Sequence, residues 1–279
     1  MPNSKVVLIT GCSTGIGRVT AEHLASKGWT VYATARRPES IADLEAKGCK
    51  TLALDVTDED SMQAAVKAVE DAEGAVGVLI NNAGYSQSGA VEEVAMDQVR
   101  RQFETNVFGL LRMCQLVLPG MRRQGFGKIV NISSMGGRLV FPGGGIYHGT
   151  KYAVEAISDA MRWEVRGFGV DVILIEPGLI KTEFGETAAH SVTEGTPSDG
   201  AYADFNAQVA AKTAGAYETR LATSPLAVAK RIERVISKKR SGSRYPITVG
   251  ARVLLAQRKL LPDRAFDAFL GTQFKRPRS

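Results

Sequence analysis

Cysteine is scarce in this sequence, which has three in 279 residues, Cys12, Cys49 and Cys114. Their number is odd and their spacing fits no metal-binding motif, so we expect neither a disulfide framework nor a metal site. We expect reduced cysteines that pack inside the protein.

Long hydrophobic runs are also missing. The apolar run at residues 6–9 is too short for a signal peptide, and no run approaches the length of a membrane span. We therefore expect a cytoplasmic protein. With 44% hydrophobic and 23% charged residues, the composition is that of an ordinary globular chain, and we expect one domain over residues 1–279.

Negative charge is rare in the last fifth of the chain, where residues 225–279 hold 14 Lys and Arg against 3 Asp and Glu. We interpret this basic end as solvated helix faces and expect no nucleic-acid partner. Peripheral contact with an anionic membrane is the alternative, since apolar residues from Val253 to Leu270 would form a face beside the arginines. Packing against the body or a sister subunit is favoured over membrane contact.

Short runs rich in Val, Ile and Leu predict buried parallel strands at residues 6–10, 30–34, 51–54, 78–81, 128–133 and 170–176. Helical patterns separate them, which indicates an α/β fold, a Rossmann-type doubly wound parallel sheet flanked by helices. A polar, Ala-rich segment at about 183–223 interrupts this rhythm and is expected to form a lid. Ser224-Pro225 predicts a helix start, with the helix running towards Arg240. A last strand at 244–249 and a helix near 252–270 follow, in a basic helical tail at about 251–279.

A glycine-rich turn follows the first predicted strand, with Gly11, Gly15 and Gly17 around Ser13 and Ile16. Three glycines at this spacing are weak evidence alone and would also suit a tight turn. Their position between the first strand and the first helix favours a dinucleotide pyrophosphate, because glycine allows the backbone to approach a ligand at a helix start.

The end of the second strand carries Arg36 and Arg37, and the nearest acid is Glu39. A carboxylate there is typical of NAD enzymes, whereas a cation suits the 2′-phosphate of NADP. We expect NADP(H) to be preferred over NAD(H), although a solvated arginine pair is the alternative. Asp55 and Val56 follow the third strand and could meet the adenine, or Asp55 could signal a helix start.

Three further motifs follow later strands: Asn82-Ala83-Gly84, Ser133-Ser134, and Tyr147 with Lys151. Each is unremarkable alone, and the tyrosine and lysine could be an ordinary surface pair on a helix. All three lie where strands end or the next helix begins, which is where open α/β sheets bind ligands.

Together these motifs resemble the short-chain dehydrogenase/reductase family over residues 5 to about 180. The resemblance implies a homo-oligomer, a homodimer or homotetramer, with catalytic residues Asn106, Ser134, Tyr147 and Lys151. Ser134 is preferred to Ser133 because of its separation from the tyrosine. The usual Tyr-x-Ala-Ser-Lys is here Tyr-His-Gly-Thr-Lys. The resemblance also implies that the segment holding Pro177, Gly178, Ile180 and Thr182 contacts the nicotinamide, although Pro-Gly alone could mark a strand exit.

The resemblance implies an oxidoreductase that transfers a hydride between the nicotinamide and a carbonyl or alcohol carbon. Tyr147 would exchange the proton with the substrate oxygen, and Ser134 would bind that oxygen. Lys151 lies one helical turn from the tyrosine, so we expect it to lower the phenol pKa and to hold the nicotinamide ribose. Asn106 would position a water that relays protons to Lys151.

The substrate is expected to be a small lipophilic carbonyl or alcohol, because apolar residues, Tyr85, Leu139, Val140, Phe141 and Phe184, lie near the expected site. The chain looks similar to the hydroxysteroid and retinol dehydrogenase branch. A 3-oxoacyl thioester reductase is an alternative, and so is a non-catalytic NADP-binding regulator, which would have lost the tyrosine or the lysine. His190 is expected to be an exposed lid residue rather than a substrate contact.

Overall fold

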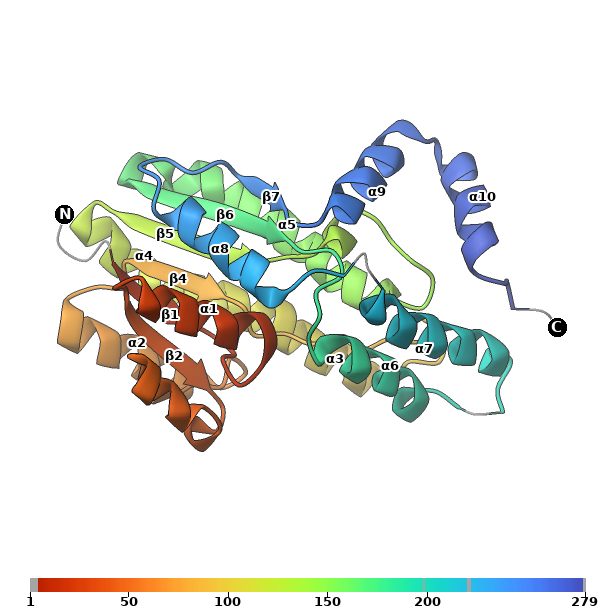
Figure 1. Cartoon of the computed structure of the whole chain (residues 1–279), viewed down its shortest axis with the longest axis horizontal. Coiled ribbons are helices and arrows are strands. Elements are labelled where there is room, and N and C mark those ends of the chain that lie inside the picture. Colours follow the sequence, from red (N-terminus) through yellow and green to blue (C-terminus); the bar gives the residue numbers. More distant parts are fainter. Residues whose placement is uncertain (1–4, 198, 220–221, 278–279) are drawn as a thin grey trace.

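A computed structural model describes residues 5–197, 199–219 and 222–277. Seven parallel strands form one sheet in the order β3-β2-β1-β4-β5-β6-β7. They are β1 (Val6–Ile9), β2 (Thr30–Ala35), β3 (Lys50–Ala53), β4 (Val78–Asn81), β5 (Gly127–Ile132), β6 (Val170–Glu176) and β7 (Arg244–Pro246). The chain adds β2 and β3 on one side of β1 and then returns to add β4 and the later strands on the other side. The predicted doubly wound fold is therefore confirmed (Figure 1).

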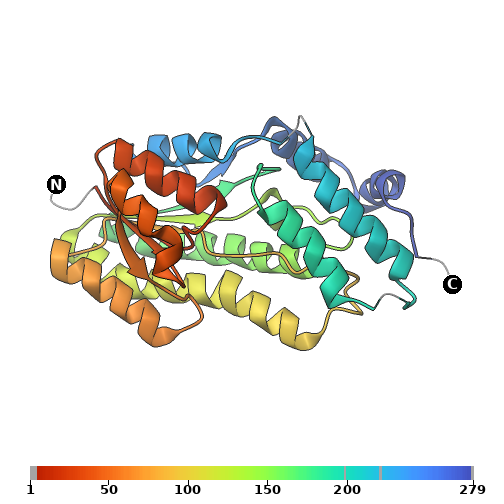
Figure 2. The ribbon, with the colours of Figure 1, turned by 60° about the horizontal axis from the view of Figure 1, so that its bottom comes forward.

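Helices cover both faces of the sheet (Figures 1 and 2). Val7 and Ile9 of β1 pack in a core with α1 (Gly15–Ser26), α8 (Pro225–Ile236) and the 3₁₀ segment η1 (Pro38–Lys47). Val6 and Leu8 point into a second core with α2 (Glu59–Glu73), α4 (Leu110–Gln124) and α5 (Gly145–Val165). Both faces of the strands are buried, which explains why they are apolar runs without alternation. All three cysteines are buried and free of disulfides.

Shorter helical segments complete the body of the molecule. Helix α3 (Met96–Phe103) continues through a π-helical segment, η2 (Glu104–Gly109), into α4. The turn η3 (Met135–Gly137) follows β5, and η4 (Arg166–Phe168) joins α5 to β6.

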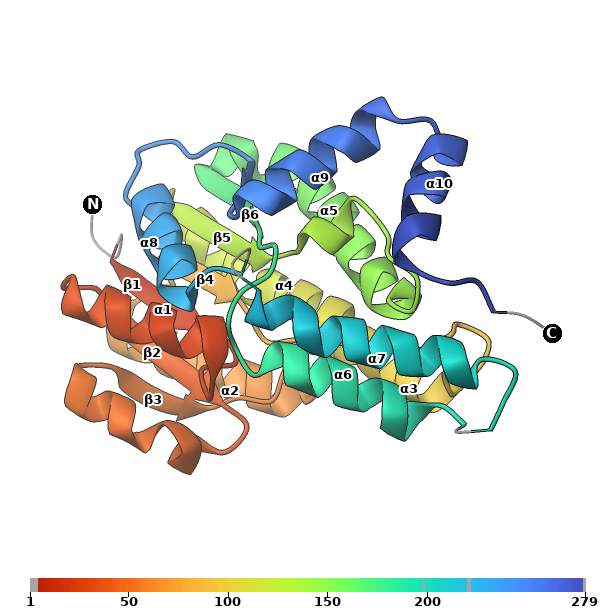
Figure 3. The ribbon, with the colours of Figure 1, turned by 45° about the vertical axis from the view of Figure 1, so that its right-hand side comes forward.

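The segment predicted as a lid folds into two helices, α6 (Phe184–Gly195) and α7 (Ala203–Glu218), which pack against each other (Figure 3). The Val209 side chain of α7 packs against the backbone of Gly143 in the body of the protein, where an added Cβ would lie 2.5 Å from it. The described part of this segment therefore packs against the loop that follows β5.

The end of the chain differs from the sequence prediction. The helix predicted from Ser224 begins there, with Ser224 Oγ accepting from Leu226 N, but it ends at Ile236. The last strand stops at Pro246, because Thr248 caps a new helix, α9 (Val249–Leu260). Pro262 then separates α9 from α10 (Asp263–Gln273), so the single predicted helix is two.

Two residues expected near the substrate lie elsewhere. Leu139 is buried in a separate apolar cluster with Leu255 of α9 and Phe266 of α10. Val140 is exposed on the surface. The described residues contain no helix long and apolar enough to cross a membrane.

Candidate active site

The glycine-rich turn is fastened to the loop that follows β4. Asn82 Nδ2 donates to the backbone oxygens of Thr10 and Gly11, at 3.0 and 2.8 Å. A Cβ at Gly17 would lie 2.3 Å from Gly11 O and 2.4 Å from Asn82 Nδ2. Only glycine leaves room for this contact, so Gly17 packs the two loops together and does not line the cavity beside them.

The start of α1 is open to an anion. Thr14 forms no side-chain cap, and the first turn contains no acidic residue. Gly15 has φ +60°, and its α-carbon faces Thr182 from the segment after β6. Uncapped N–H groups at a helix N-terminus favour negative charge, so this turn fits the pyrophosphate of a dinucleotide.

Arg36 and Arg37 are both exposed at the end of β2, but they differ in position. Arg36 lines the cavity and Arg37 does not. Asp55 lines it too, while its Oδ1 accepts from the backbone N and the hydroxyl of Thr57, at 2.9 and 2.8 Å. Asp58, rather than Asp55, caps α2.

These elements surround one cavity of about 1770 Å³ at the carboxyl ends of the strands. Every residue predicted to bind the cofactor lines it except Gly17 and Arg37. The others are Gly11, Ser13, Gly15, Ile16, Arg36, Asp55, Val56, Asn82, Ala83, Gly84, Tyr147, Lys151, Pro177, Gly178, Ile180 and Thr182.

Tyr147 and Lys151 lie on the first turns of α5 and both line the cavity, as does Ser134. Lys151 Nζ donates to the backbone oxygen of Ile132, at the end of β5, at 2.8 Å, and lies 5.8 Å from the centre of the Tyr147 ring. Ser134 Oγ accepts from Gly136 N at 3.0 Å, which fixes its turn. The helix and the strand end therefore present the three side chains to one space.

The electrostatics of Tyr147 differ from the sequence expectation. Burial raises the pKa of the Tyr147 phenol, Tyr217 adds to the increase, and Ser134 opposes it. Lys151, whose Nζ donates to Ile132 O, does not offset this increase. The expected net reduction of the tyrosine pKa is therefore wrong for this structure, in which the protonated phenol is favoured.

Burial acts on Lys151 as well and lowers its pKa to about 8, while the charge of Glu155 opposes this change. Desolvation penalises the charged form of either group. The site thus favours a neutral phenol beside a lysine that can lose its proton under mildly alkaline conditions.

Asn106 lies behind the cavity wall on η2 and is 1% exposed. Its Oδ1 accepts from Tyr85 N at 3.1 Å, and its Nδ2 donates to Tyr85 O at 2.9 Å and to Thr150 Oγ1 at 3.1 Å. A Cβ at Gly84 would lie 3.0 Å from Asn106 Oδ1 and 3.9 Å from Lys151 Nζ. The backbone of Gly84 therefore lies beside both the Asn106 amide and the Lys151 ammonium.

The unusual residues between the tyrosine and the lysine have clear positions. Thr150 Oγ1 donates to Tyr147 O at 2.7 Å and so links α5 to Asn106. The buried His148 ring fits against two glycines, since a Cβ at Gly136 or Gly144 would lie 2.5 Å from a ring carbon. Phe141 N donates to His148 Nδ1 at 3.3 Å.

The far part of the cavity is lined by residues from late in the chain. Phe184 of α6 lies 5.6 Å from Tyr147 between ring centres. Sequence reasoning missed Tyr217 of α7 and, from the tail, Phe269 and Phe274, which also line the cavity. The spacing of apolar residues in the tail predicted packing against the body or a sister subunit, but it did not indicate that this face reaches the cavity. His190 is largely exposed and pairs with Glu194.

Comparison with known proteins gives the class to which this fold and site belong. The model of the short chain dehydrogenase family matches residues 5–192. A short-chain dehydrogenase from Streptomyces avermitilis superposes with a TM-score of 0.82 at 34% identity, covering 96% of each chain. The 3-ketodihydrosphingosine reductase of Bacteroides thetaiotaomicron is 36% identical over 93% of this chain and 94% of its own. The NADPH-dependent 3-dehydrocapnine reductase of Ornithobacterium rhinotracheale is 33% identical, with 98% of both chains covered.

The chain belongs to the short-chain dehydrogenase/reductase family. It is an oxidoreductase that acts on CH–OH groups with a nicotinamide cofactor. A serine dehydrogenase complexed with NADP+ shares the fold, with a TM-score of 0.76 at 26% identity over 87% of this chain and 94% of that one.

Proposed function

We propose that this protein is an NADP(H)-dependent oxidoreductase that interconverts a carbonyl and an alcohol on a lipophilic, steroid-, retinoid- or lipid-like molecule. The observation that carries the proposal is the position of Tyr147. Its side chain lines a single cavity together with the cofactor-binding turn at Gly15 and an apolar wall from the end of the chain. A non-catalytic regulator has no need for this arrangement.

The contacts support the catalytic roles that we propose. When bound, the nicotinamide supplies or accepts the hydride. The Tyr147 hydroxyl gives a proton to the substrate oxygen, and the Ser134 hydroxyl hydrogen-bonds that oxygen. Lys151 holds the ribose and stabilises negative charge on the phenol oxygen. Asn106 supports these groups through Thr150, and its proposed role is to order a proton-relaying water beside Gly84.

A preference for NADP(H) over NAD(H) rests on Arg36. It lies at the cavity edge after β2, where a guanidinium can pair with the 2′-phosphate. Asp55, the next strand-end acid, has one carboxylate oxygen occupied by Thr57.

A lipophilic substrate is supported by the distal walls of the cavity. Phe141, Phe184, Val209, Leu254 and Phe269 line it, and they come from the loop after β5, the two lid helices and the two tail helices. Two relatives are named as reductases, one of 3-ketodihydrosphingosine and the other of 3-dehydrocapnine. We infer that α6 and α7 form the lid and that the tail closes the far end.

Carbonyl reduction at neutral pH requires Tyr147 as a proton donor. Burial raises the pKa of Tyr147, so the phenol is protonated and ready to donate, as carbonyl reduction requires. Alcohol oxidation needs the phenolate and should accelerate as the pH rises.

The experiment is a screen of lipophilic ketones and aldehydes, including 3-ketodihydrosphingosine, that follows NADPH absorbance at neutral pH. We expect turnover with NADPH, a smaller kcat/KM with NADH, and faster reduction of lipophilic ketones than of short polar ones. Equal turnover of polar and apolar ketones would contradict the substrate class, and equal use of NADH would contradict the cofactor preference.

A further inference from the structure

Glu155 is a buried carboxylate one helical turn after Lys151 on α5 and is 6% exposed. Residues four apart lie on the same face of a helix. Both residues meet the turn that follows Ser134, because a Cβ at Gly137 would lie 2.9 Å from Glu155 Cγ and 3.0 Å from Lys151 O. The carboxylate therefore lies next to the proposed catalytic helix turn and is shielded from solvent.

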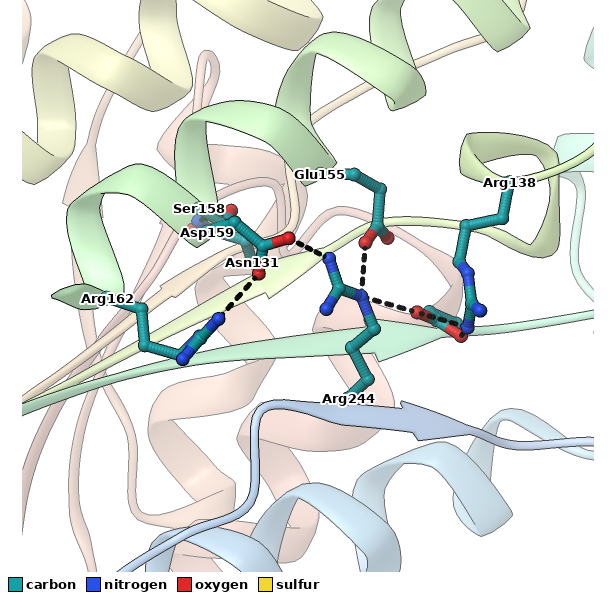
Figure 4. A network of polar contacts seen from close by, with 8 residues as sticks. Asn131, Arg138, Glu155, Ser158, Asp159, Arg162 and Arg244 are labelled. Carbon is teal, nitrogen blue, oxygen red and sulfur yellow. Dashed lines mark hydrogen bonds and ion pairs between the residues drawn. The ribbon is translucent and has the colours of Figure 1, made fainter.

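An arginine from the last strand holds this carboxylate (Figure 4). Arg244 Nε donates to Glu155 Oε2 at 2.9 Å, and the same nitrogen lies 3.4 Å from Glu176 Oε1. Arg244 also pairs with Asp159, one further turn along α5. A single guanidinium thus joins β7 to the catalytic helix and to the end of β6, directly before Pro177.

The other members of the network balance its charge. Glu176 pairs with Arg138 at 3.3 Å, and Asp159 pairs with Arg162 at 3.1 Å. Burial raises the pKa of the fully buried Glu176, and the charge of Glu155 adds to this increase. The field of Glu155 therefore extends beyond its direct partner.

Lys151 has no ion-pair partner within 4 Å among residues 5–197, 199–219 and 222–277. Its ammonium lies near three uncharged groups, Ile132 O, the Tyr147 ring and the backbone of Gly84. Burial favours the uncharged forms of Tyr85 and His148, which line the same cavity, because it raises the pKa of the phenol and lowers that of the imidazole to about 4. Glu104 on η2 lines the same cavity but is exposed to solvent. Glu155, shielded from solvent one turn away on α5, is the carboxylate whose charge opposes the lowering of the Lys151 pKa by burial.

We propose that Glu155 is a positioning residue that keeps the Lys151 ammonium protonated in the buried site, and that Arg244 fixes Glu155 for this purpose. The effect acts through space, because screening is weak where solvent is excluded. The consequence for turnover rests on the function proposed above for Lys151, whereas the effect on its protonation does not.

The test is a pH titration of the cofactor-free protein by NMR, with lysine carrying ¹³C at the ε position. The Lys151 signal is assigned by its loss in Lys151→Met. In Glu155→Gln we expect the Lys151 titration midpoint to fall by about one pH unit. Asp159→Asn is the matched control, since it removes a carboxylate of the same network one turn further away, and it should leave the midpoint unchanged.

Turnover gives the second measurement. In Glu155→Gln the alkaline limb of the kcat profile should move to lower pH by the same amount, and in Asp159→Asn it should stay in place. An unshifted Lys151 midpoint in folded Glu155→Gln would overturn the proposal. A shifted midpoint with an unmoved kcat limb would support it and count against the role proposed for Lys151.

A neutral pair provides the test if Glu155→Gln does not fold. The double variant Glu155→Gln with Arg244→Gln leaves two amides that can hydrogen-bond and no unpaired guanidinium. It should lower the Lys151 midpoint as well, because it removes the carboxylate that lies one turn from Lys151 on the same face of α5, whereas the removed cation belongs to β7. An unchanged midpoint in this variant would overturn the proposal too.

Discussion

Gly15, at the start of α1, lies directly against Thr182, which follows β6: a Cβ at Gly15 would be 3.4 Å from the threonine Cβ. Two segments far apart in sequence therefore meet across the cavity that the cofactor is proposed to fill. Gly15 also has φ +60°, where a side chain is strained.

Gly15→Ala should weaken NADPH binding by tenfold or more, because an added methyl narrows this gap and the αL conformation costs about 1–2 kcal/mol. Calorimetry measures the dissociation constant. Gly28→Ala is the matched control, since Gly28 has φ +75° with nothing within 4 Å of an added Cβ and lies away from the cavity. It should lower stability but keep the affinity for NADPH. Equal loss of affinity in both variants would show that strain alone is responsible.

Arg36→Ala should reduce kcat/KM for NADPH by about 10 to 100-fold, the range for a lost charge-assisted contact of about 1.5–3 kcal/mol. Its kcat/KM for NADH should change little. Arg37→Ala removes the same charge from a side chain outside the cavity and should have a much smaller effect. An unaltered ratio of NADPH to NADH use in Arg36→Ala would refute the role given to Arg36.

The sequence was sufficient for the sheet and for gathering all but two of the proposed cofactor-binding residues at one cavity. Buried parallel strands are apolar throughout, and their carboxyl ends meet at one edge, so the sequence alone places Ser134 and Tyr147 together. Gly17 and Arg37 show the limit of motif spacing. Gly17 is needed for packing against Asn82, and Arg37 does not line the cavity although it adjoins Arg36.

Tertiary contacts decided what the sequence could not. Leu139 was expected near the substrate, but it packs instead in an apolar cluster with residues of α9 and α10. Burial raises the pKa of Tyr147 although Lys151 lies nearby. The four-residue spacing between the tyrosine and the lysine gives no information about this burial. The tail phenylalanines could be recognised as an apolar face, but only the fold shows that Phe269 reaches the cavity.

Phe269→Ala should lower kcat/KM for large apolar ketones by roughly tenfold, because it removes half-buried apolar surface from the far wall. Small ketones that do not reach this wall should be affected less. Leu260→Ala serves for comparison, since Leu260 is 81% exposed on α9 and does not line the cavity. The same loss for small and large ketones would argue against a substrate wall at Phe269.

His148 should make the fold sensitive to acid. Burial lowers its pKa to about 4, below the value of about 6.5 in an unfolded chain. Between these values only the unfolded state binds the proton, so stability falls as the pH drops through about 6.5 and the loss is complete near pH 4. The expected cost at pH 5 is about 2 kcal/mol.

Urea unfolding at pH 7 and pH 5 measures this cost. His148→Asn cannot take up the proton but can keep an acceptor for Phe141 N, so it should lose less stability between the two pH values than the parent. The same pH dependence in both proteins would assign the acid sensitivity to other groups.

The most direct test of the catalytic account is Tyr147→Phe, which removes one oxygen and little volume. We predict that kcat for NADPH-dependent reduction of a ketone found in the screen falls by about 100-fold or more, the range for a lost general acid. NADPH affinity, measured by calorimetry, should be nearly unchanged. Turnover close to that of the parent would contradict the role of Tyr147 as the proton donor.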